Sequence, residues 1–223
     1  MSAHRFTAIS TGLSMALLGA LTSALAASAP PETSTCLACH GANGEGMAAA
    51  GYPRLAGLSS LYLTEQLNAY IDGRRVNAIM SGIANPLSAQ QIQSIADYFS
   101  ALPASSAPSP SALDAAQSSL GRQLAERGDW DNGIPACFNC HASGGIGVQP
   151  AFPPIAGQPA AYIEAQIKAW KTGTRQGSPQ NLANALMYSV AMRMDETQTK
   201  AVAAWLAAQP LPAPDTRPAH TKP

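Results

Sequence analysis

The sequence predicts an all-α protein built from two tandem copies of one helical unit. Three observations support this prediction. The motifs of the first half return in the second half, apolar residues recur at helical spacing, and no segment shows the sustained alternation typical of a strand. The length of 223 residues is sufficient for two small domains.

Residues 1–26 are predicted to be a signal peptide. Arg5 precedes the apolar run ISTGLSMALLGALTSALA, which is short for a spanning helix and is interrupted by Thr, Gly and Ser. Ala24-Leu25-Ala26 fits the small-residue pattern of a cleavage site, so we expect a mature chain that begins at Ala27 and is exported to the periplasm. The alternative is an uncleaved membrane anchor.

The mature chain is expected to hold two domains, over residues 27–103 and 113–210. The Pro/Ser-rich stretch 104–112 between them lacks an apolar period and is a predicted linker. The proline-rich end of the chain, residues 211–223, is predicted to be a disordered tail.

Each copy is predicted to contain two amphipathic helices. In the first copy they cover residues 59–72 and 89–101, and Ser88 with Gln91 forms a capping-box pattern before the second helix. Asp195 and Gln198 repeat that pattern in the second copy. A further helix is expected from about residue 113 to 127, and the first copy has no counterpart to it.

Composition excludes one class of function. Charged residues are only 12% of the chain, and 13 Lys and Arg balance 13 Asp and Glu. No run of basic residues occurs, which argues against a nucleic-acid-binding protein.

All four cysteines lie in two copies of one pattern, CLACH at residues 36–40 and CFNCH at residues 137–141. Two disulfides would not explain a histidine directly after each pair, and a zinc site needs four ligands where each cluster offers three. Cys-x-x-Cys-His is the attachment pattern of c-type haem, in which two thiols bond to the porphyrin and the histidine binds iron. We therefore predict two covalently bound haem c groups. The predicted attachment and iron-binding residues are Cys36, Cys39 and His40 in the first copy and Cys137, Cys140 and His141 in the second.

The segments that follow the motifs align along their length. YPRLAG matches FPPIAG at an offset of 153 − 53 = 100, and Arg75 matches Arg175 at the same offset. MSGIANPLSAQQIQSIADYFSAL then matches MYSVAMRMDETQTKAVAAWLAAQ at an offset of 187 − 80 = 107. The second copy therefore carries a net insertion of 107 − 100 = 7 residues between Arg175 and Met187.

The residue at the sixth position of each iron decides between electron transfer and ligand binding. In the first copy the candidates are Met47, shortly after His40, and Met80, in a stretch expected to be irregular between two helices. Met80 is the predicted ligand because its position returns in the second copy as Met187.

The second copy offers three methionines. The repeat alignment places Met194 opposite Leu87, a core position, and Met192 opposite Asn85. Met187 is therefore the predicted ligand, with Met192 and Met194 as alternatives. Histidine–methionine ligation raises the reduction potential of the iron.

Arg75 and Arg175 are candidate partners of the haem propionates, because a guanidinium binds carboxylates well. The alternative is that each is a solvated arginine after a helix.

The chain resembles dihaem class I cytochromes c, and most of all the cytochrome c(4) family, over residues 34–209. The resemblance rests on CLACHGANGEG, PRLAGLSSLYLTEQL and DGRRVNAIMSGIANPLSAQQIQSIADYFSAL and on their second copies. The family has a Gln after Pro-x-Leu-x-Gly; here that position is Leu58 in the first copy and Gln158 in the second.

The resemblance implies two small helical domains packed face to face, with the haems near their interface. It also implies Met80 and Met187 as axial ligands. The carbonyls of Pro53 and Pro153 are expected to accept hydrogen bonds from Nδ1 of His40 and His141, respectively. Members of the family carry electrons from a quinol-oxidising complex toward a terminal oxidase.

Three functions follow as hypotheses. The first is a periplasmic one-electron carrier in a respiratory chain, between a quinol-oxidising complex or a dehydrogenase and a terminal oxidase, without catalytic residues. The second is a haem-bearing electron-transfer subunit of a periplasmic dehydrogenase, because a partner could complete the first domain, which lacks an N-terminal helix. The third is a dihaem enzyme with one open iron, which only the insertion before Met187 supports. We expect redox proteins as partners, and neither nucleic acid nor a small-molecule substrate.

Overall fold

The computed structural model describes residues 29–105, 114–149, 151–176 and 182–211. Within these ranges the chain is helical, and its extended pairing consists of isolated bridges only. The predicted signal peptide, most of the predicted linker and nearly all of the predicted tail lie outside the described residues. No helix in the described part is long and apolar enough to cross a membrane.

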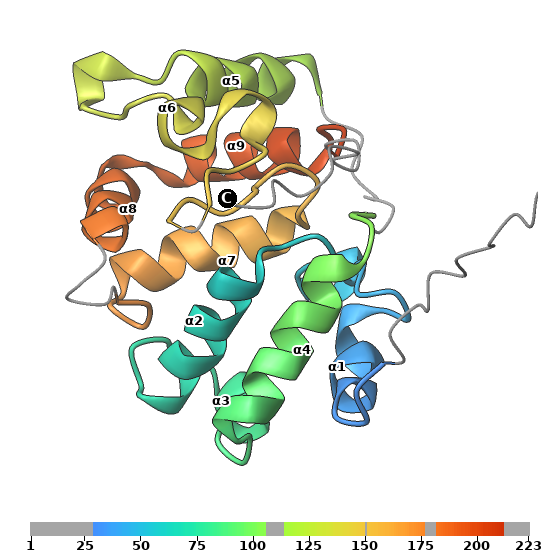
Figure 1. Ribbon diagram of the computed structural model, residues 1–223. Coiled ribbons are helices and arrows are strands. Elements are labelled where there is room, and N and C mark those ends of the chain that lie inside the picture. The colour runs from blue at the N-terminus through green and yellow to red at the C-terminus, as the bar shows by residue number, and fades with distance from the viewer. Residues whose placement is uncertain (1–28, 106–113, 150, 177–181, 212–223) are drawn as a thin grey trace, which may run out of the picture.

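The helices of the two units follow one another in the same order, apart from an additional helix at the start of the second unit (Figure 1). The elements of the first unit are α1 (Thr33–His40), η1 (Ala48–Ala50), α2 (Ser60–Ile71), α3 (Ala78–Ala84) and α4 (Ala89–Ala101). Those of the second unit are α5 (Ala115–Glu126), η2 (Trp130–Asn132), α6 (Cys137–His141), η3 (Ser143–Gly145), α7 (Ala160–Lys171), α8 (Leu182–Arg193) and α9 (Glu196–Ala207).

Both predicted capping boxes are present and fix the starts of α4 and α9. The Ser88 side chain accepts from the backbone N–H of Gln91, whose side chain accepts in return from the Ser88 backbone. Asp195 and Gln198 make the same pair of bonds at α9. These bonds satisfy backbone donors that a helix leaves unpaired at its N-terminus.

The segment around Met80 is a helix and not the irregular stretch that the sequence predicted. Asn77 lies in an extended conformation before α3, and its side-chain oxygen accepts from the backbone N–H of Met80 at 3.0 Å. This N-cap stabilises a helix too short to show an apolar period in the sequence. Met80 is therefore held on a short capped helix.

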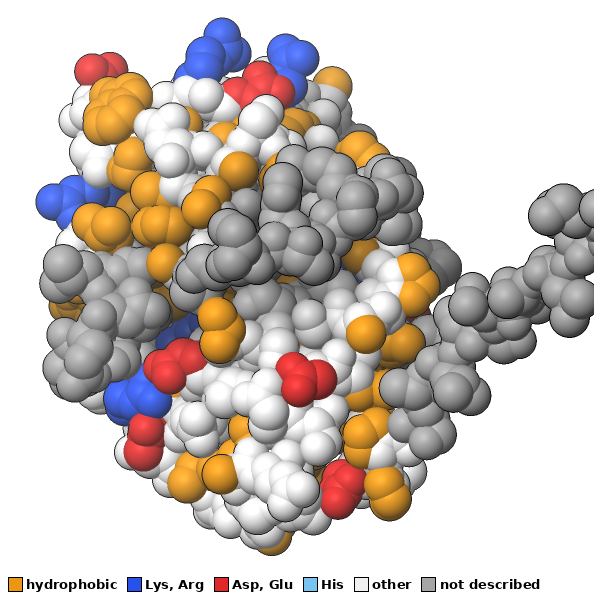
Figure 2. Space-filling view, viewed as in Figure 1, with side chains coloured by type: hydrophobic (Ala, Val, Ile, Leu, Met, Phe, Trp, Pro, Cys, Tyr) orange, Lys and Arg blue, Asp and Glu red, His pale blue; other side chains and the backbone are white. Residues whose placement is uncertain are grey.

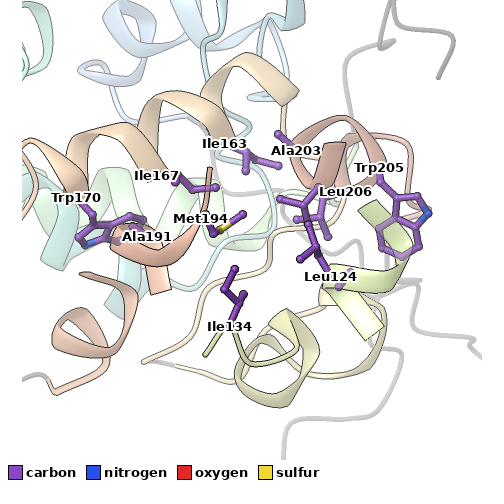
Figure 3. Packing of buried hydrophobic residues seen from close by; sticks show 12 residues of the cluster. Leu124, Ile134, Ile163, Ile167, Trp170, Ala191, Met194, Ala203, Trp205 and Leu206 are labelled. Atoms are coloured by element: carbon purple, nitrogen blue, oxygen red, sulfur yellow. The ribbon is translucent and has the colours of Figure 1, made fainter. Parts of the chain in front are cut away.

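The larger hydrophobic core belongs to the second unit. Helix α5 crosses α9 so closely that a side chain at Gly121 would lie 2.4 Å from the Ala201 carbonyl oxygen. Figure 3 shows Met194 between Ile163 and Ile167 of α7 on one side and Ile134 on the other. The first unit has a smaller core around α2 and α4 and, in its described part, no counterpart to α5.

The two units meet where α7 packs against η1 and where the antiparallel bridge between Arg75 and Arg175 follows the ends of α2 and α7 (Figure 1). The backbone N–H of Val76 donates to Thr174 O at 2.7 Å, and that of Gln176 donates to Arg74 O at 2.6 Å. Equivalent residues of the two copies thus face each other, as in a two-fold symmetric dimer formed within one chain.

Candidate haem sites

Each Cys-x-x-Cys-His motif forms a short helix that ends at its histidine. α1 ends at His40 and α6 ends at His141. In a helix, positions i, i+3 and i+4 share one side, so the two thiols and the imidazole of each motif face the same region. None of the four thiols takes part in a disulfide. Burial raises the pKa of Cys36 above its usual value and that of Cys137 to about 11.

Both histidines are buried and bonded in the same way. Nδ1 of His40 lies 2.8 Å from Pro53 O, and Nδ1 of His141 lies 2.8 Å from Pro153 O. A carbonyl can only accept, so Nδ1 carries the proton and Nε2 keeps a lone pair for a metal. Burial lowers the pKa of both imidazoles, against a smaller upward effect of the proline carbonyls, which favours the neutral form that ligates iron.

Glycines make the histidine–proline contact possible. Gly46 and Gly147 have φ of +87° and +84°, and their N–H groups donate to the carbonyls of His40 at 2.7 Å and His141 at 2.8 Å. A Cβ on Gly46 would lie 2.7 Å from Arg54 N, and one on Gly147 would lie 2.6 Å from Pro154 N. Only glycine allows the turn and the proline segment to approach this closely.

A cavity of about 370 Å³ in the second unit adjoins the thiols and the imidazole. Cys137, Cys140 and His141 line it together with apolar residues of α7, α8 and α9. A flat, largely apolar group with attachment points at two thiols fits this lining. The cavity also reaches Arg175 and Tyr162 at the junction between the units, so a carboxylate at the edge of such a group would meet a cation there.

The methionine candidates differ in their surroundings. Met187 and Met194 both line the cavity, whereas Met192 is 52% exposed and does not. Met194 is buried at 5% among the core residues, and Met187 is partly buried on α8. In the first unit Met47 is 43% exposed and Met80 is partly buried. Met80 and Met187 remain the predicted ligands.

Arg75 and Arg175 are buried, so the alternative of solvated arginines is wrong. Arg75 is 6% exposed and Arg175 is 7% exposed. Each guanidinium lies over an aromatic ring of its own unit, Arg75 over Tyr70 at 4.7 Å and Arg175 over Trp170 at 4.1 Å. Such stacking stabilises a cation that has lost much of its hydration.

The same two guanidinium groups also reach across the junction. Nη2 of Arg75 donates to Tyr162 Oη at 3.0 Å and to Gln166 Oε1 at 2.8 Å. Nη2 of Arg175 makes the reciprocal bonds, to Tyr62 Oη at 3.2 Å and to Gln66 Oε1 at 3.0 Å. Arg175 thus lies both in the wall of the cavity and in the contact between the units.

A second cross-unit contact joins Arg54 and Gln158, which the sequence did not predict. Gln158 binds the backbone of Arg54, whose guanidinium donates to the carbonyls of Ala56 and Ala156 at 2.5 Å and 3.3 Å. Arg54 is 1% exposed, and burial lowers its pKa to about 10. The sequence could have indicated this contact, because both residues differ from their counterparts in the repeat. Pro154 stands opposite Arg54, and Leu58 stands opposite Gln158.

Comparison with known proteins places this site in context. A family model described as Cytochrome c matches residues 31–103 and 118–209. A protein of Thiomonas intermedia named "Thiosulfate dehydrogenase electron acceptor" is 56% identical over 202 residues, which cover 89% of this chain and 91% of the relative.

Two solved structures share the fold. A thiosulfate dehydrogenase (TsdBA) from Marichromatium purpuratum superimposes with a TM-score of 0.72 at 42% identity and covers 82% of this chain. This chain spans only 40% of that longer chain. Reduced cytochrome c4 from Pseudomonas stutzeri superimposes with a TM-score of 0.70 at 31% identity, over 80% of this chain and 95% of that one.

Proposed function

This chain belongs to the cytochrome c family and is a dihaem electron carrier of the cytochrome c4 type, and on that premise we propose that it accepts electrons from a thiosulfate-oxidising dehydrogenase. One observation carries the proposal: the 56% identity to the Thiomonas intermedia electron acceptor extends over nearly the whole of both chains. The likeness to one part of the Marichromatium purpuratum dehydrogenase adds support. A dehydrogenase is one of the two donors named in the first hypothesis, and the likeness to the TsdBA chain also fits the second, a haem-bearing subunit of a periplasmic dehydrogenase.

The chain binds two haem c groups through its two Cys-x-x-Cys-His motifs. When bound, each haem supplies reversible one-electron oxidation and reduction of its iron. The residues of the chain hold and tune the group. His40 and His141 each keep Nε2 available because Nδ1 donates to a proline carbonyl, and this bond raises the basicity of the ligand. In the proposal, Met80 and Met187 are the sixth ligands of the two irons, and Arg75 and Arg175 bind haem propionates.

The proposed docking region is the exposed surface of α8. Tyr188 and Met192, one turn apart, and Leu186, on the side of the cavity, are each about half exposed on this helix, and hydrophobic side chains gather over the same region in Figure 2. Leu186 also lines the cavity, so it lies at the boundary between the second haem site and solvent. Small, weakly charged contacts of this kind suit a transient redox encounter.

Export to the periplasm belongs to the same proposal. The run before Ala27 has the features of a signal peptide, which supports this part of the proposal. N-terminal sequencing of the protein from a periplasmic extract is expected to begin at Ala27.

Stopped-flow mixing tests the donor. The oxidised holoprotein is mixed with a purified thiosulfate dehydrogenase and thiosulfate, and haem reduction is followed optically. We expect rapid reduction that requires both enzyme and substrate. Leu186→Lys is expected to slow this reaction, whereas Leu61→Lys, at an exposed leucine of α2, is expected to leave it unchanged. Reduction no faster than by thiosulfate alone would refute the proposal.

A respiratory carrier that receives electrons from a quinol-oxidising complex is the second candidate, favoured by the likeness to cytochrome c4. It differs in its donor. Membranes that contain a quinol-oxidising complex and a quinol would then reduce the protein faster than the dehydrogenase does. In both cases the proposed final acceptor is a terminal oxidase.

A further inference from the structure

The helices that carry Met80 and Met187 are fastened to the preceding helix by different bonds. In the first unit the hydroxyl of Ser81, next to Met80 on α3, donates to Tyr70 O of α2 at 3.4 Å. In the second copy Tyr188 stands at the position of Ser81, at the offset of 188 − 81 = 107, and it is 49% exposed. The short side chain that fastens the first methionine is therefore not repeated beside the second.

The bond in the second unit runs in the opposite direction and lies farther from the methionine. Lys171 is the last residue of α7, and its Nζ donates to the backbone carbonyl of Met194, directly after the end of α8. The counterpart of Lys171 in the first copy is Ile71, at the offset of 171 − 71 = 100, whose side chain has no donor. α8 lies beside α7 (Figure 1). The second copy thus has its own means of fixing the helix that carries its methionine.

This contact fixes the C-terminal end of α8. The last carbonyls of a helix lack partners within the helix and form the negative end of its dipole, so an ammonium group is favourable there. Met194 is only 5% exposed and packs between α7 and Ile134, which shields its carbonyl from water (Figure 3). The loss of a charged donor from a buried carbonyl is costly, because water cannot readily replace it. We therefore expect α8 to keep its position only while Lys171 holds this end.

Met187 lies 194 − 187 = 7 residues before the anchored residue. Seven residues are about two turns, or about 10 Å, of α-helix, and both methionines line the haem cavity. Two turns of helix move as one body, so a shift at Met194 would displace Met187. We propose that Lys171 is a positioning residue of the second haem site, which holds α8 so that Met187 stays at the sixth position of the iron. The proposal rests on Met187 as the sixth ligand, which is part of the proposed function, and not on the identity of the electron donor.

Cyanide binding to the oxidised holoprotein tests this role, because cyanide can occupy the sixth position only after the methionine has left it. Each haem gives its own kinetic phase, and Met187→Ala assigns the phase of the second haem. Lys171→Leu removes the ammonium group without adding a sulfur that could bind iron. We expect this variant to bind cyanide at the second haem about tenfold faster than the wild type, the effect of losing one hydrogen bond from a charged group. The phase of the first haem is expected to stay unchanged.

Two further variants of α7 serve as controls. Lys171→Arg keeps a charged donor and is expected to bind cyanide at nearly the rate of the wild type. Lys168→Leu makes the same chemical change at an exposed position one turn earlier and is expected to match the wild type at both haems. Circular dichroism of each variant shows whether its helix content is retained.

A double variant separates positioning of the methionine from a general loosening of the second unit. In Met187→Ala the sixth position is already accessible, so Lys171→Leu is expected to add nothing to the cyanide rate in that background. The proposal is overturned if Lys171→Leu binds cyanide as Lys168→Leu does, or if it accelerates binding by the same factor with and without Met187. If Met187→Ala alone leaves both phases as in the wild type, Met187 is not the ligand, and that part of the proposed function fails together with this proposal.

Discussion

Gln158 of the second unit holds the backbone of Arg54 in the first. The Arg54 N–H donates to Gln158 Oε1 at 2.9 Å, and Gln158 Nε2 donates to Arg54 O at 3.1 Å. Arg54 directly follows Pro53, whose carbonyl accepts from His40. The second unit therefore helps to position the predicted iron ligand of the first, through a side chain that the first unit lacks at its own equivalent, Leu58.

Replacing Gln158 by Leu, the residue of the first copy, is expected to lower the free energy of unfolding by about 1–3 kcal/mol, because it leaves two buried backbone groups of Arg54 unpaired. It is also expected to shift the potential of the first haem, since Pro53 and hence His40 lose support. Denaturant unfolding and potentiometry measure the two effects. Gln123→Leu, at an exposed position of α5, serves as the control. Equal stability of the two variants would contradict this account.

The predicted methionine ligands can be tested by substitution and optical spectroscopy. Met187→Ala is expected to remove the methionine-to-ferric-iron charge-transfer band of one haem and to lower that haem's potential, because a thioether favours Fe(II). Met80→Ala is expected to do the same for the other haem. Met194→Leu keeps the core filled and is expected to retain both bands. A band lost in Met194→Leu and kept in Met187→Ala would assign the ligand to Met194 instead.

Gly147→Ala is expected to destabilise the second unit by about 2–4 kcal/mol. The new methyl group would meet Pro154 N at 2.6 Å, and the φ of +84° is strained for alanine. Gly173→Ala measures the cost of the positive φ without a steric clash, because the φ of Gly173 is +72° but nothing lies within 4 Å of the added Cβ. That variant is expected to cost only about 1 kcal/mol. Thermal unfolding followed by circular dichroism compares the two, and an equal loss would show that the close approach is unimportant.

Ionisation of the buried Tyr70 phenol is expected to destabilise the fold at high pH. Burial raises its pKa from 10.0 to about 12, while Arg75 acts in the opposite direction. Between pH 10 and 12 the unfolded chain has released the phenolic proton and the folded chain retains it, so stability falls as pH rises through this window, by about 2 kcal/mol. Tyr70→Phe is expected to remove this part of the alkaline loss. Denaturant unfolding at pH 8 and pH 11 measures it, with Tyr188→Phe at a half-exposed position as the control. An alkaline loss equal in all three proteins would exclude Tyr70 as its source.

The sequence alone determined the chemistry that depends on short-range spacing. Two thiols three residues apart and an adjacent histidine specify haem attachment wherever the segment lies, so both motifs were readable without a fold. The caps at Ser88 and Asp195 are equally local, because each joins residues three positions apart. The internal repeat also predicted that the two halves share one fold.

Tertiary structure decided what depends on contacts between residues about a hundred positions apart. The spacing of Arg75 and Arg175 could not distinguish a solvated side chain from one buried against the opposite unit, because that difference depends on how α2 and α7 meet. The bond from Gln158 to Arg54 arises in the same way, from a place where the two copies differ. Local patterns fix what each unit binds, and the packing of one unit on the other fixes which charges become buried and which side chains they contact.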